Sequence, residues 1–344
     1  MKRRHYSEAR RPLPMERDRR LNCLLTPHRR LSREAAEMPH TLRAERTALR
    51  PVWAYLGPAS AEAYRLYVRR CPEAQARVAS LDSLAAKIRP HLRTDPLEVL
   101  VLGTGEGRQD VRLASLLLDT REQPSTLGLV DLSAPLLTAA YVHAAESLPH
   151  AESWALLADL EDLSVHADLL CLPGRQRVVL LLGGTLGELE DELRFLRYGL
   201  AACSAGDLLV LDVPLSAGED EEARWRRQGG AARRCLDEAK AWLTTALAPY
   251  TEAEPIEWTL RLDAHATLPG SYAWSAVARL PGESRPREIE LWRRTHYRLA
   301  VVAGHLGALG WEQVAACRYG EALPGELQVY WRCEAARPAA RRAP

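Results

Sequence analysis

The segment Glu98-Val-Leu-Val-Leu-Gly103-Thr-Gly105-Glu-Gly107 decides the fold of this chain. Its apolar run predicts a buried strand, which leads directly into glycines at alternate positions. Glycine permits a tight turn at that point and lets a ligand approach the backbone closely. A helix is expected to follow, and its first N–H groups would lie free beside the turn. A strand, a glycine loop and a helix in this order are typical of open α/β folds.

Further apolar runs follow on both sides of predicted helices, at residues 126–130, 154–158, 178–182 and 208–213. Apolar runs without alternation indicate strands of a parallel sheet that is covered on both faces. Two more strands are expected at 311–319 and 326–333. The predicted fold class is α/β, with a Rossmann-like, doubly wound, mostly parallel seven-stranded sheet and an inserted α+β substrate subdomain.

The domain organisation follows from where the alternation of predicted strands and helices starts and where it is interrupted. Residues 51–93 have helical periodicity and predict a helical cap, with Pro72 separating two helices. The core is expected at 94–215 and 287–334, and the second part would open with a helix at about 288–309. The inserted substrate or cap subdomain spans 216–286, with a helix at about 219–247 and an antiparallel pair of strands at 257–267 and 271–280.

Both ends of the chain differ from its centre in composition. Residues 1–50 are rich in arginine and show little periodicity, which predicts a disordered extension or a true start at Met38. The alternative is an arm that binds RNA, although aromatic residues for base stacking are almost missing there. Residues 335–344 are expected to form a disordered tail.

The overall composition is that of an ordinary globular enzyme. The 344 residues carry a formal net charge of +1, so no overall field recruits nucleic acid or an anionic membrane. The seven cysteines include no CxxC pair, so reduced thiols are expected rather than a disulfide framework or a metal site. No apolar run reaches the roughly 18 residues that span a bilayer, and no secretory signal is evident. A cytoplasmic protein is expected, with no metal.

The glycine loop distinguishes two classes of ligand. Dinucleotide enzymes use G-x-G-x-x-G, which would place the third glycine at position 108, where this chain has Arg108. The G-x-G-x-G spacing resembles the first motif of class I methyltransferases instead. This resemblance implies S-adenosyl-L-methionine as cofactor, and it implies cofactor contacts from Gly103, Thr104, Gly105 and Gly107.

Residues at the ends of the next strands fit the same ligand, because ligands of open parallel sheets bind at the carboxyl ends of the strands. In class I methyltransferases an acid at the end of the second strand holds the ribose and one after the third holds the adenine amino group. Gly183 and Gly184 follow the fourth strand, where donor and acceptor would meet. Each carboxylate has an alternative role as a helix N-cap. The remaining predicted cofactor residues are Asp131, Leu132, Asp159 and Leu160.

Two longer segments resemble the histidine-specific methyltransferase-like family, which makes trimethylhistidine in ergothioneine synthesis. They are Leu181-Leu-Gly183-Gly-Thr185-Leu-Gly187-Glu188-Leu189 and Ala205-Gly206-Asp207-Leu-Leu-Val-Leu-Asp212-Val. The resemblance implies the fold and the cofactor. It also places Glu188 where that family has an asparagine that contacts the substrate amino acid.

Glu188 is the predicted catalytic residue. Methyl transfer needs a neutral amine, so a carboxylate near the methyl group can hold the ammonium and help to remove its proton. The alternative is that Glu188 and its acidic neighbours only favour a helix start. Glu188 and Thr185 are the predicted substrate-binding residues. Three aromatic residues of the insert are candidates for a wall around a cationic acceptor, although packing is an alternative role for them: Trp258, Tyr272 and Trp274.

The sequence therefore predicts a methyltransferase that acts on nitrogen of a small amino-acid-like or secondary-metabolite substrate. One alternative is an RNA or protein methyltransferase that uses the arginine-rich N-terminus. Another is a non-catalytic, cofactor-binding partner protein, and a dinucleotide oxidoreductase is disfavoured by Arg108. A small-molecule partner and no membrane are expected. The acceptor, the number of methyl groups and the oligomeric state stay open.

Overall fold

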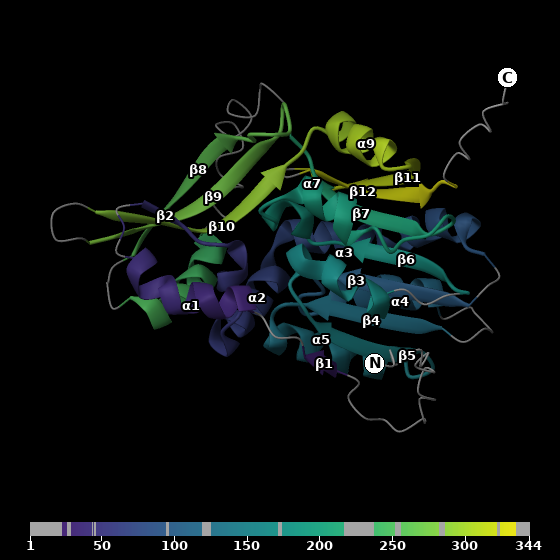
Figure 1. Cartoon of the computed structure of the whole chain (residues 1–344), viewed down its shortest axis with the longest axis horizontal. Helices are drawn as coiled ribbons and strands as arrows, with labels where there is room; N and C mark the ends of the chain where they lie inside the picture. The colour runs from purple at the N-terminus through teal and green to yellow at the C-terminus, as the bar shows by residue number, and fades with distance from the viewer. Residues whose placement is uncertain are drawn as a thin grey trace, which may run out of the picture.

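The computed structural model describes residues 23–25, 29–42, 44, 46–93, 96–118, 125–170, 174–216, 237–251, 256–281, 286–321 and 324–334. Within them the chain forms two β-sheets with helices packed around both (Figure 1). The strands of the larger sheet are β1 (Cys23–Leu25), β3 (Leu97–Leu102), β4 (Thr126–Asp131), β5 (Glu152–Leu157), β6 (Gln176–Leu181), β7 (Leu208–Pro214), β11 (Trp311–Tyr319) and β12 (Gly325–Arg332).

The larger sheet has the order β1-β5-β4-β3-β6-β7-β12-β11. Strands β1 and β3 to β7 run parallel, whereas β12 is antiparallel to both β7 and β11. The predicted mostly parallel seven-stranded α/β sheet is confirmed, and the three-residue β1 adds an eighth strand at its edge. The order reverses direction between β3 and β6, and this switch point is where open α/β sheets bind ligands.

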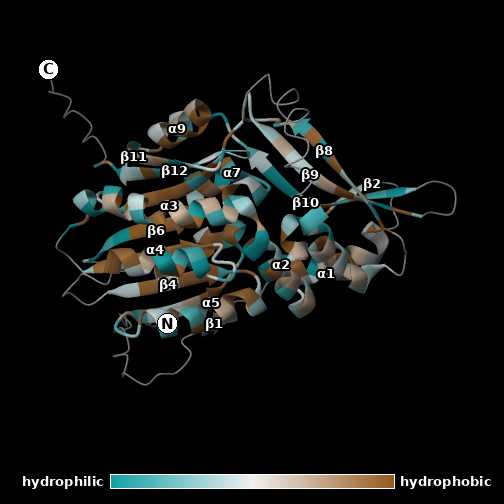
Figure 2. Ribbon diagram, turned by 180° about the vertical axis from the view of Figure 1, so that it is seen from behind, coloured by the Kyte–Doolittle hydropathy of each residue, from teal (hydrophilic) through white to brown (hydrophobic). Residues whose placement is uncertain are grey.

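The central strands bury both of their faces, which explains why their sequences do not alternate. On β3, Val99 and Val101 pack into one core cluster, while Leu100 and Leu102 pack into another. The first cluster contains α3 (Pro72–Ile88), α4 (Arg108–Leu118) and α5 (Ala134–Ser147). The second contains the turn η3 (Leu160–His166), α6 (Ala167–Leu170), the π-helical turn η5 (Phe195–Gly199) and α9 (Leu299–Ala308). Figure 2 shows the hydrophobic colouring along the central strands between these layers.

The smaller sheet has the order β2-β10-β9-β8. Its strands are β2 (Arg46–Ala48), β8 (Glu257–Ala264), β9 (Tyr272–Leu280) and β10 (Arg287–His296). The antiparallel pair expected in the insert is present as β8 and β9. One face of this sheet forms a third core cluster with α1 (Arg29–Thr41), the turn η1 (Pro51–Ala54) and the helix at 237–247.

The helix expected at about 288–309 is wrong in its first half. Residues 287–296 form β10, which pairs with β9 on one side and β2 on the other. Only α9 is helical, so the core resumes at α9 rather than at residue 287. The apolar residues of β10 satisfy both periods over a short span, and pairing with β9 decides between them.

The prediction of disorder for residues 1–50 is wrong where the structure describes them. Residues 23–25, 29–41 and 46–48 form β1, α1 and β2. Residues 1–22 and 26–28, the tail 335–344 and residues 217–236 of the predicted insert lie outside the described residues. The helices expected at 51–93 are present as α2 (Pro58–Arg70) and α3, which Pro72 separates. However, α3 packs on the core sheet instead of forming a cap.

A buried charge network fastens the smaller sheet to the core. Arg294 of β10 donates to both oxygens of Glu73 on α3, at 2.8 and 2.5 Å. Arg77 reaches Glu73 at 3.5 Å and Asp212 of β7 at 2.8 Å, and Tyr319 donates to Asp212. Although burial would raise it, the two guanidinium groups hold the pKa of Glu73 below its ordinary value. The network therefore holds α3, β7 and β10 in one arrangement.

Candidate functional site

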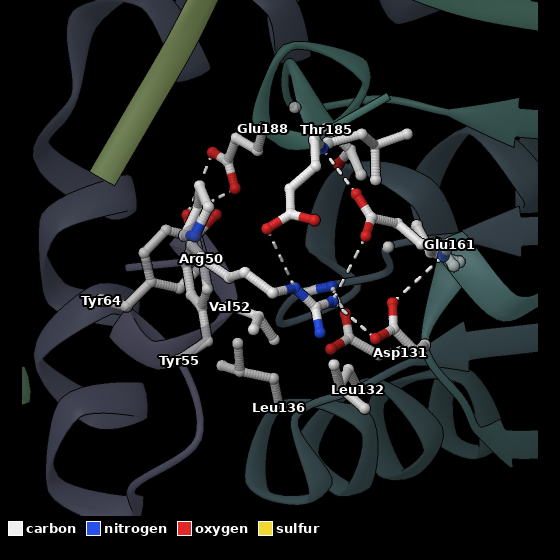
Figure 3. A pocket seen from close by; sticks show the side chains of 18 residues that line it. Arg50, Val52, Tyr55, Tyr64, Asp131, Leu132, Leu136, Glu161, Thr185 and Glu188 are labelled. Carbon is white, nitrogen blue, oxygen red and sulfur yellow. Dashed lines mark hydrogen bonds and ion pairs between the residues drawn. The ribbon is translucent and has the colours of Figure 1, made fainter. Parts of the chain in front are cut away.

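A cavity lies at the carboxyl ends of β3, β4, β5 and β6, at the switch point of the larger sheet. One wall comes from the loops after these strands, and the other comes from η1, its flanking residues and α2 (Figure 3). The residues that line it are Arg50, Pro51, Val52, Tyr55, Tyr64, Gly103, Gly105, Asp131, Leu132, Leu136, Asp159, Leu160, Glu161, Gly183, Thr185, Glu188, Leu189 and Glu190.

Nine of the twelve predicted site residues line this cavity. The three others lie close by without lining it: Thr104, Gly107 and Gly184. Gly107 has a positive φ of 75°, and a Cβ there would lie 2.7 Å from that of Ala140. Glycine is therefore required at this position for α4 to pack on α5, whatever binds in the cavity. Thr104 is buried, and its backbone bonds to the end of β4.

Asp131 ends β4 with its carboxylate in the cavity wall. One oxygen accepts the N–H of Gly105 and the other accepts the N–H of Ser133, each at 2.8 Å. A carboxylate oxygen has two acceptor positions, so each still has capacity for a ligand hydroxyl. Burial raises the pKa of Asp131 to about 6, although the backbone N–H groups oppose this. The group is therefore anionic at neutral pH and suited to hold a diol.

Asp159 is engaged by an arginine from the other wall. The Arg50 guanidinium lies 2.5 Å from its carboxylate, and both side chains are only 8% exposed. The other carboxylate oxygen accepts the N–H of Glu161 at 3.1 Å, an N-cap contact that the sequence left open as an alternative. An adenine amino group at Asp159 would thus share this carboxylate with Arg50.

Arg50 belongs to an ionic cluster that fixes the N-terminal segment over the cavity. It also lies 3.4 Å from Glu34 of α1 and 3.7 Å from Glu161. Arg30 of α1 binds Glu34 and Glu161 at 3.0 and 2.9 Å, and it also pairs with Glu190. Sequence reasoning missed these arginines because residues 1–50 were expected to be disordered. The acidic run after β6 was the signal that could have suggested basic partners.

Glu188 lies where three parts of the chain meet. It belongs to the turn η4 (Thr185–Glu188), which follows β6. Tyr55, next to η1, donates its hydroxyl to both carboxylate oxygens at 3.0 and 2.9 Å. Trp292 of β10 donates its indole N–H to one of them at 3.0 Å, beside an irregularity in the β10–β9 register. Such bulges re-aim side chains next to functional sites.

The surroundings of Glu188 tune its protonation. Burial raises the pKa of Glu188 to about 7, although the hydrogen bonds from Trp292 and Tyr55 oppose the shift. A carboxylate whose pKa lies near neutrality can accept a proton and release it again. Thr185 also lines the cavity, but its hydroxyl donates to the Leu182 carbonyl at 2.8 Å, so it can offer a ligand only its acceptor capacity.

The aromatic wall lies elsewhere than the sequence suggested. The residues that line the cavity do not include Trp258, Tyr272 or Trp274. Trp258 packs in the third core cluster and donates to Thr244, which is the packing role left open for it. The aromatic side chains that do line the cavity are Tyr55 and Tyr64. Their contribution was hidden because tyrosines at helical spacing also suit a core.

The chemistry of the lining residues is compatible with S-adenosyl-L-methionine, the cofactor that the sequence predicts. Asp131 has acceptor capacity for the ribose hydroxyls, and apolar side chains provide a surface for adenine next to Asp159: Val52, Leu132, Leu136 and Leu160. Gly103 and Gly105 line the cavity without a side chain of their own, and the side chain of Thr185 lies against Gly103. The sulfonium of this cofactor also suits a cavity that is rich in carboxylates.

Metal binding and membrane insertion are two other properties on which the described residues bear. No group of three or more His, Cys, Asp or Glu side chains is placed to hold a metal ion in the part of the chain that the structure describes. Among the described helices, none combines the length and the apolar character needed to cross a membrane.

Comparisons with known proteins find similar folds at low sequence identity. No family model and no curated protein matches the chain. The CcbJ methyltransferase from Streptomyces caelestis is 15% identical with a TM-score of 0.39, over 74% of this chain and 90% of that one. The 1,6-didemethyltoxoflavin-N1-methyltransferase of Burkholderia thailandensis is 13% identical with a TM-score of 0.44, over 80% and 88%. The glycopeptide N-methyltransferase MtfA is 14% identical with a TM-score of 0.39, over 76% and 98%.

Proposed function

We propose that this chain is an S-adenosyl-L-methionine-dependent methyltransferase that methylates nitrogen in a small amino-acid-like or secondary-metabolite substrate. The observation that carries the proposal is the position of Glu188. A carboxylate with a pKa of about 7 lines the same cavity as Asp131 and the glycine loop, and residues from two other parts of the chain hold it there. A carboxylate that served only to start a helix would need no hydrogen bond from Tyr55 or Trp292.

The methyl donor would bind along the core wall. Asp131 would accept the two ribose hydroxyls, and Asp159 with Leu160 and Leu132 would hold the adenine. Gly103, Gly105 and Gly183 would let the donor approach the ends of β3 and β6. When bound, the donor supplies an electrophilic methyl group on a sulfonium.

The residues at the far end of the cavity would act on the acceptor. The Glu188 carboxylate takes one proton from the acceptor ammonium, which frees the nitrogen lone pair. The neutral nitrogen would then face the methyl group that the bound donor supplies, and the released proton would stay on Glu188. Alignment of nitrogen, methyl carbon and sulfur provides most of the rate enhancement.

The resemblance to the histidine-specific family supports S-adenosyl-L-methionine as the methyl donor. It gives less support to histidine as the methyl acceptor. Glu188 stands where that family has an asparagine that contacts the substrate amino acid. An acid in place of an amide changes both the charge and the proton chemistry at this position. We therefore propose an amine acceptor without naming histidine.

The test is a comparison of Glu188→Gln with the wild type. Gln keeps the shape but cannot take a proton, so turnover with a panel of small amines should fall by about 10²- to 10⁴-fold. Binding of S-adenosylhomocysteine, measured by calorimetry, should be unchanged. Glu146→Gln on the exposed face of α5 is the matched control and should leave both measurements as in the wild type. Full turnover by Glu188→Gln would refute the role of Glu188, and donor binding with no turnover of any amine would favour a non-catalytic protein.

A further inference from the structure

The structure points to the class of acceptor: we propose that the cavity takes a small molecule whose reacting nitrogen arrives as a cationic ammonium, with no carboxylate next to it. The ammonium would sit in a corner formed by Tyr55, Tyr64 and Glu188. This inference rests on the proposed methyl transfer. It narrows the substrate class to amines that carry no carboxylate beside the reacting nitrogen.

The charges around the cavity favour a cation. Five carboxylates line it, from Asp131, Asp159, Glu161, Glu188 and Glu190, and Arg50 is the guanidinium among the lining residues. Arg50 is already shared among Asp159, Glu161 and Glu34 at 2.5 to 3.7 Å. The lining residues therefore offer a substrate carboxylate no guanidinium that is not already paired. Arg50 and Arg30 pair with Asp159, Glu161 and Glu190, whereas neither arginine contacts Glu188, so an ammonium there meets a carboxylate without a guanidinium beside it.

The aromatic rings at the Glu188 end provide a second, independent reason. Tyr55 and Tyr64 both line the cavity, with ring centroids 4.8 Å apart and planes at 90°. A cation above the face of an aromatic ring is attracted by the negative charge there, most strongly when it is desolvated. Two perpendicular rings beside a carboxylate make a corner that suits an ammonium better than a neutral or anionic group.

The corner is held rigidly in place. Trp242 packs behind both rings, at 5.1 Å from Tyr55 and 5.0 Å from Tyr64, and it is 1% exposed. Its indole N–H donates to the carbonyl of Ala54 at 2.7 Å, and Ser133 donates to the carbonyl of Tyr55 at 2.7 Å. A site that is already ordered loses little entropy when a ligand binds, so weak cation–π attraction can contribute to affinity.

The experiment uses three probes of similar size on the full chain saturated with S-adenosylhomocysteine. Choline carries a quaternary ammonium, 3,3-dimethylbutan-1-ol is its neutral isostere, and glycine betaine adds a carboxylate. Binding is followed by tryptophan fluorescence and checked by saturation-transfer NMR. We expect choline to bind about 5- to 30-fold more tightly than the isostere, which is the range that cation–π attraction gives. Betaine should bind more weakly than choline.

Variants test whether the corner is responsible. Tyr64→Leu should remove most of the preference for choline, while Tyr64→Phe keeps the aromatic face and should retain it. Tyr198→Leu, at an exposed tyrosine outside this cavity, is the matched control and should leave the preference unchanged. Equal binding of choline and the isostere, or an unchanged preference in a folded Tyr64→Leu protein, would overturn the inference. Both outcomes leave the proposed function standing if S-adenosylhomocysteine still binds, whereas failure of S-adenosylhomocysteine to bind would overturn the proposed function itself.

Discussion

The two walls of the cavity are built in different ways. The core wall consists of short loops that directly follow β3 to β6, so each residue is placed by the strand before it. The N-terminal wall is placed by contacts between residues far apart in sequence, 109 positions for Arg50 and Asp159 and 133 for Tyr55 and Glu188. The first wall is therefore encoded locally, whereas the second exists only once the core has folded.

The largest expected effect tests how the smaller sheet is joined to the core. Glu73→Gln leaves Arg294 and Arg77 without their shared carboxylate in a buried place. Loss of one partner of a buried ion pair should lower the free energy of unfolding by about 3–5 kcal/mol in urea denaturation. The control is Asp82→Asn, which breaks the exposed pair with Arg112 and should cost under about 1 kcal/mol. If the two variants lost similar amounts of unfolding free energy, the network would not be what holds the smaller sheet to the core.

A second variant tests the core wall alone. Gly107→Ala forces a Cβ against Ala140 and strains a backbone with a φ of 75°. Overpacking of this kind should lower the free energy of unfolding by about 1–3 kcal/mol. Gly304→Ala on α9, where a new Cβ has open space, is the control and should stabilise by up to about 1 kcal/mol. A Gly107→Ala protein as stable as the wild type would show that α4 and α5 can shift apart.

The pH dependence of kcat/KM tests the role of Glu188, a core-wall residue whose pKa is influenced by Tyr55 of the N-terminal wall. The raised pKa of Glu188, about 7, means that the carboxylate loses its charge as the pH falls through 7. Burial dominates this shift, while Tyr55, Trp292 and Arg294 oppose it and Asp131 adds to it. For turnover of an amine, kcat/KM should therefore fall about tenfold per pH unit below 7. Below pH 6, protonation of Asp131 should weaken donor binding as well. A profile that stays flat from pH 5.5 to 8 would contradict the role of Glu188.

The smallest expected effect concerns the N-terminal wall. Arg50→Ala removes the contact to Asp159 and weakens the hold on α1. Amide hydrogen exchange in residues 29–42 should become about fivefold faster or more, which corresponds to about 1 kcal/mol of local opening. The amides of β3 should be unchanged. Faster exchange in β3 as well would show that the two walls are not independent.

The difference between the walls also explains how much could be predicted from the sequence. The sheet and nine residues of the cavity follow from apolar runs that end in glycine or aspartate, because such signals are local. The N-terminal helix is not evident from the sequence, because its arginines suggest a solvated extension. Only the folded chain pairs Arg30 with Glu161 and Glu190. The sequence predicts a helix where β10 lies, because pairing with β9, which decides the conformation, is not a local signal. Tyr55 and Tyr64 were missed because only the folded chain brings them to Glu188.

The central claim is that Asp131 and the glycine loop bind S-adenosyl-L-methionine. The most direct test is calorimetric titration of the purified protein with S-adenosylhomocysteine, alongside NADH and an Asp131→Ala variant. We predict saturable binding of S-adenosylhomocysteine to the wild type and no binding of NADH. Binding of S-adenosylhomocysteine to Asp131→Ala should be about 10- to 100-fold weaker, because the ribose hydroxyls of the ligand lose a charged acceptor. Absence of S-adenosylhomocysteine binding, or a preference for NADH, would contradict the account and leave the glycine loop as a feature of the fold alone.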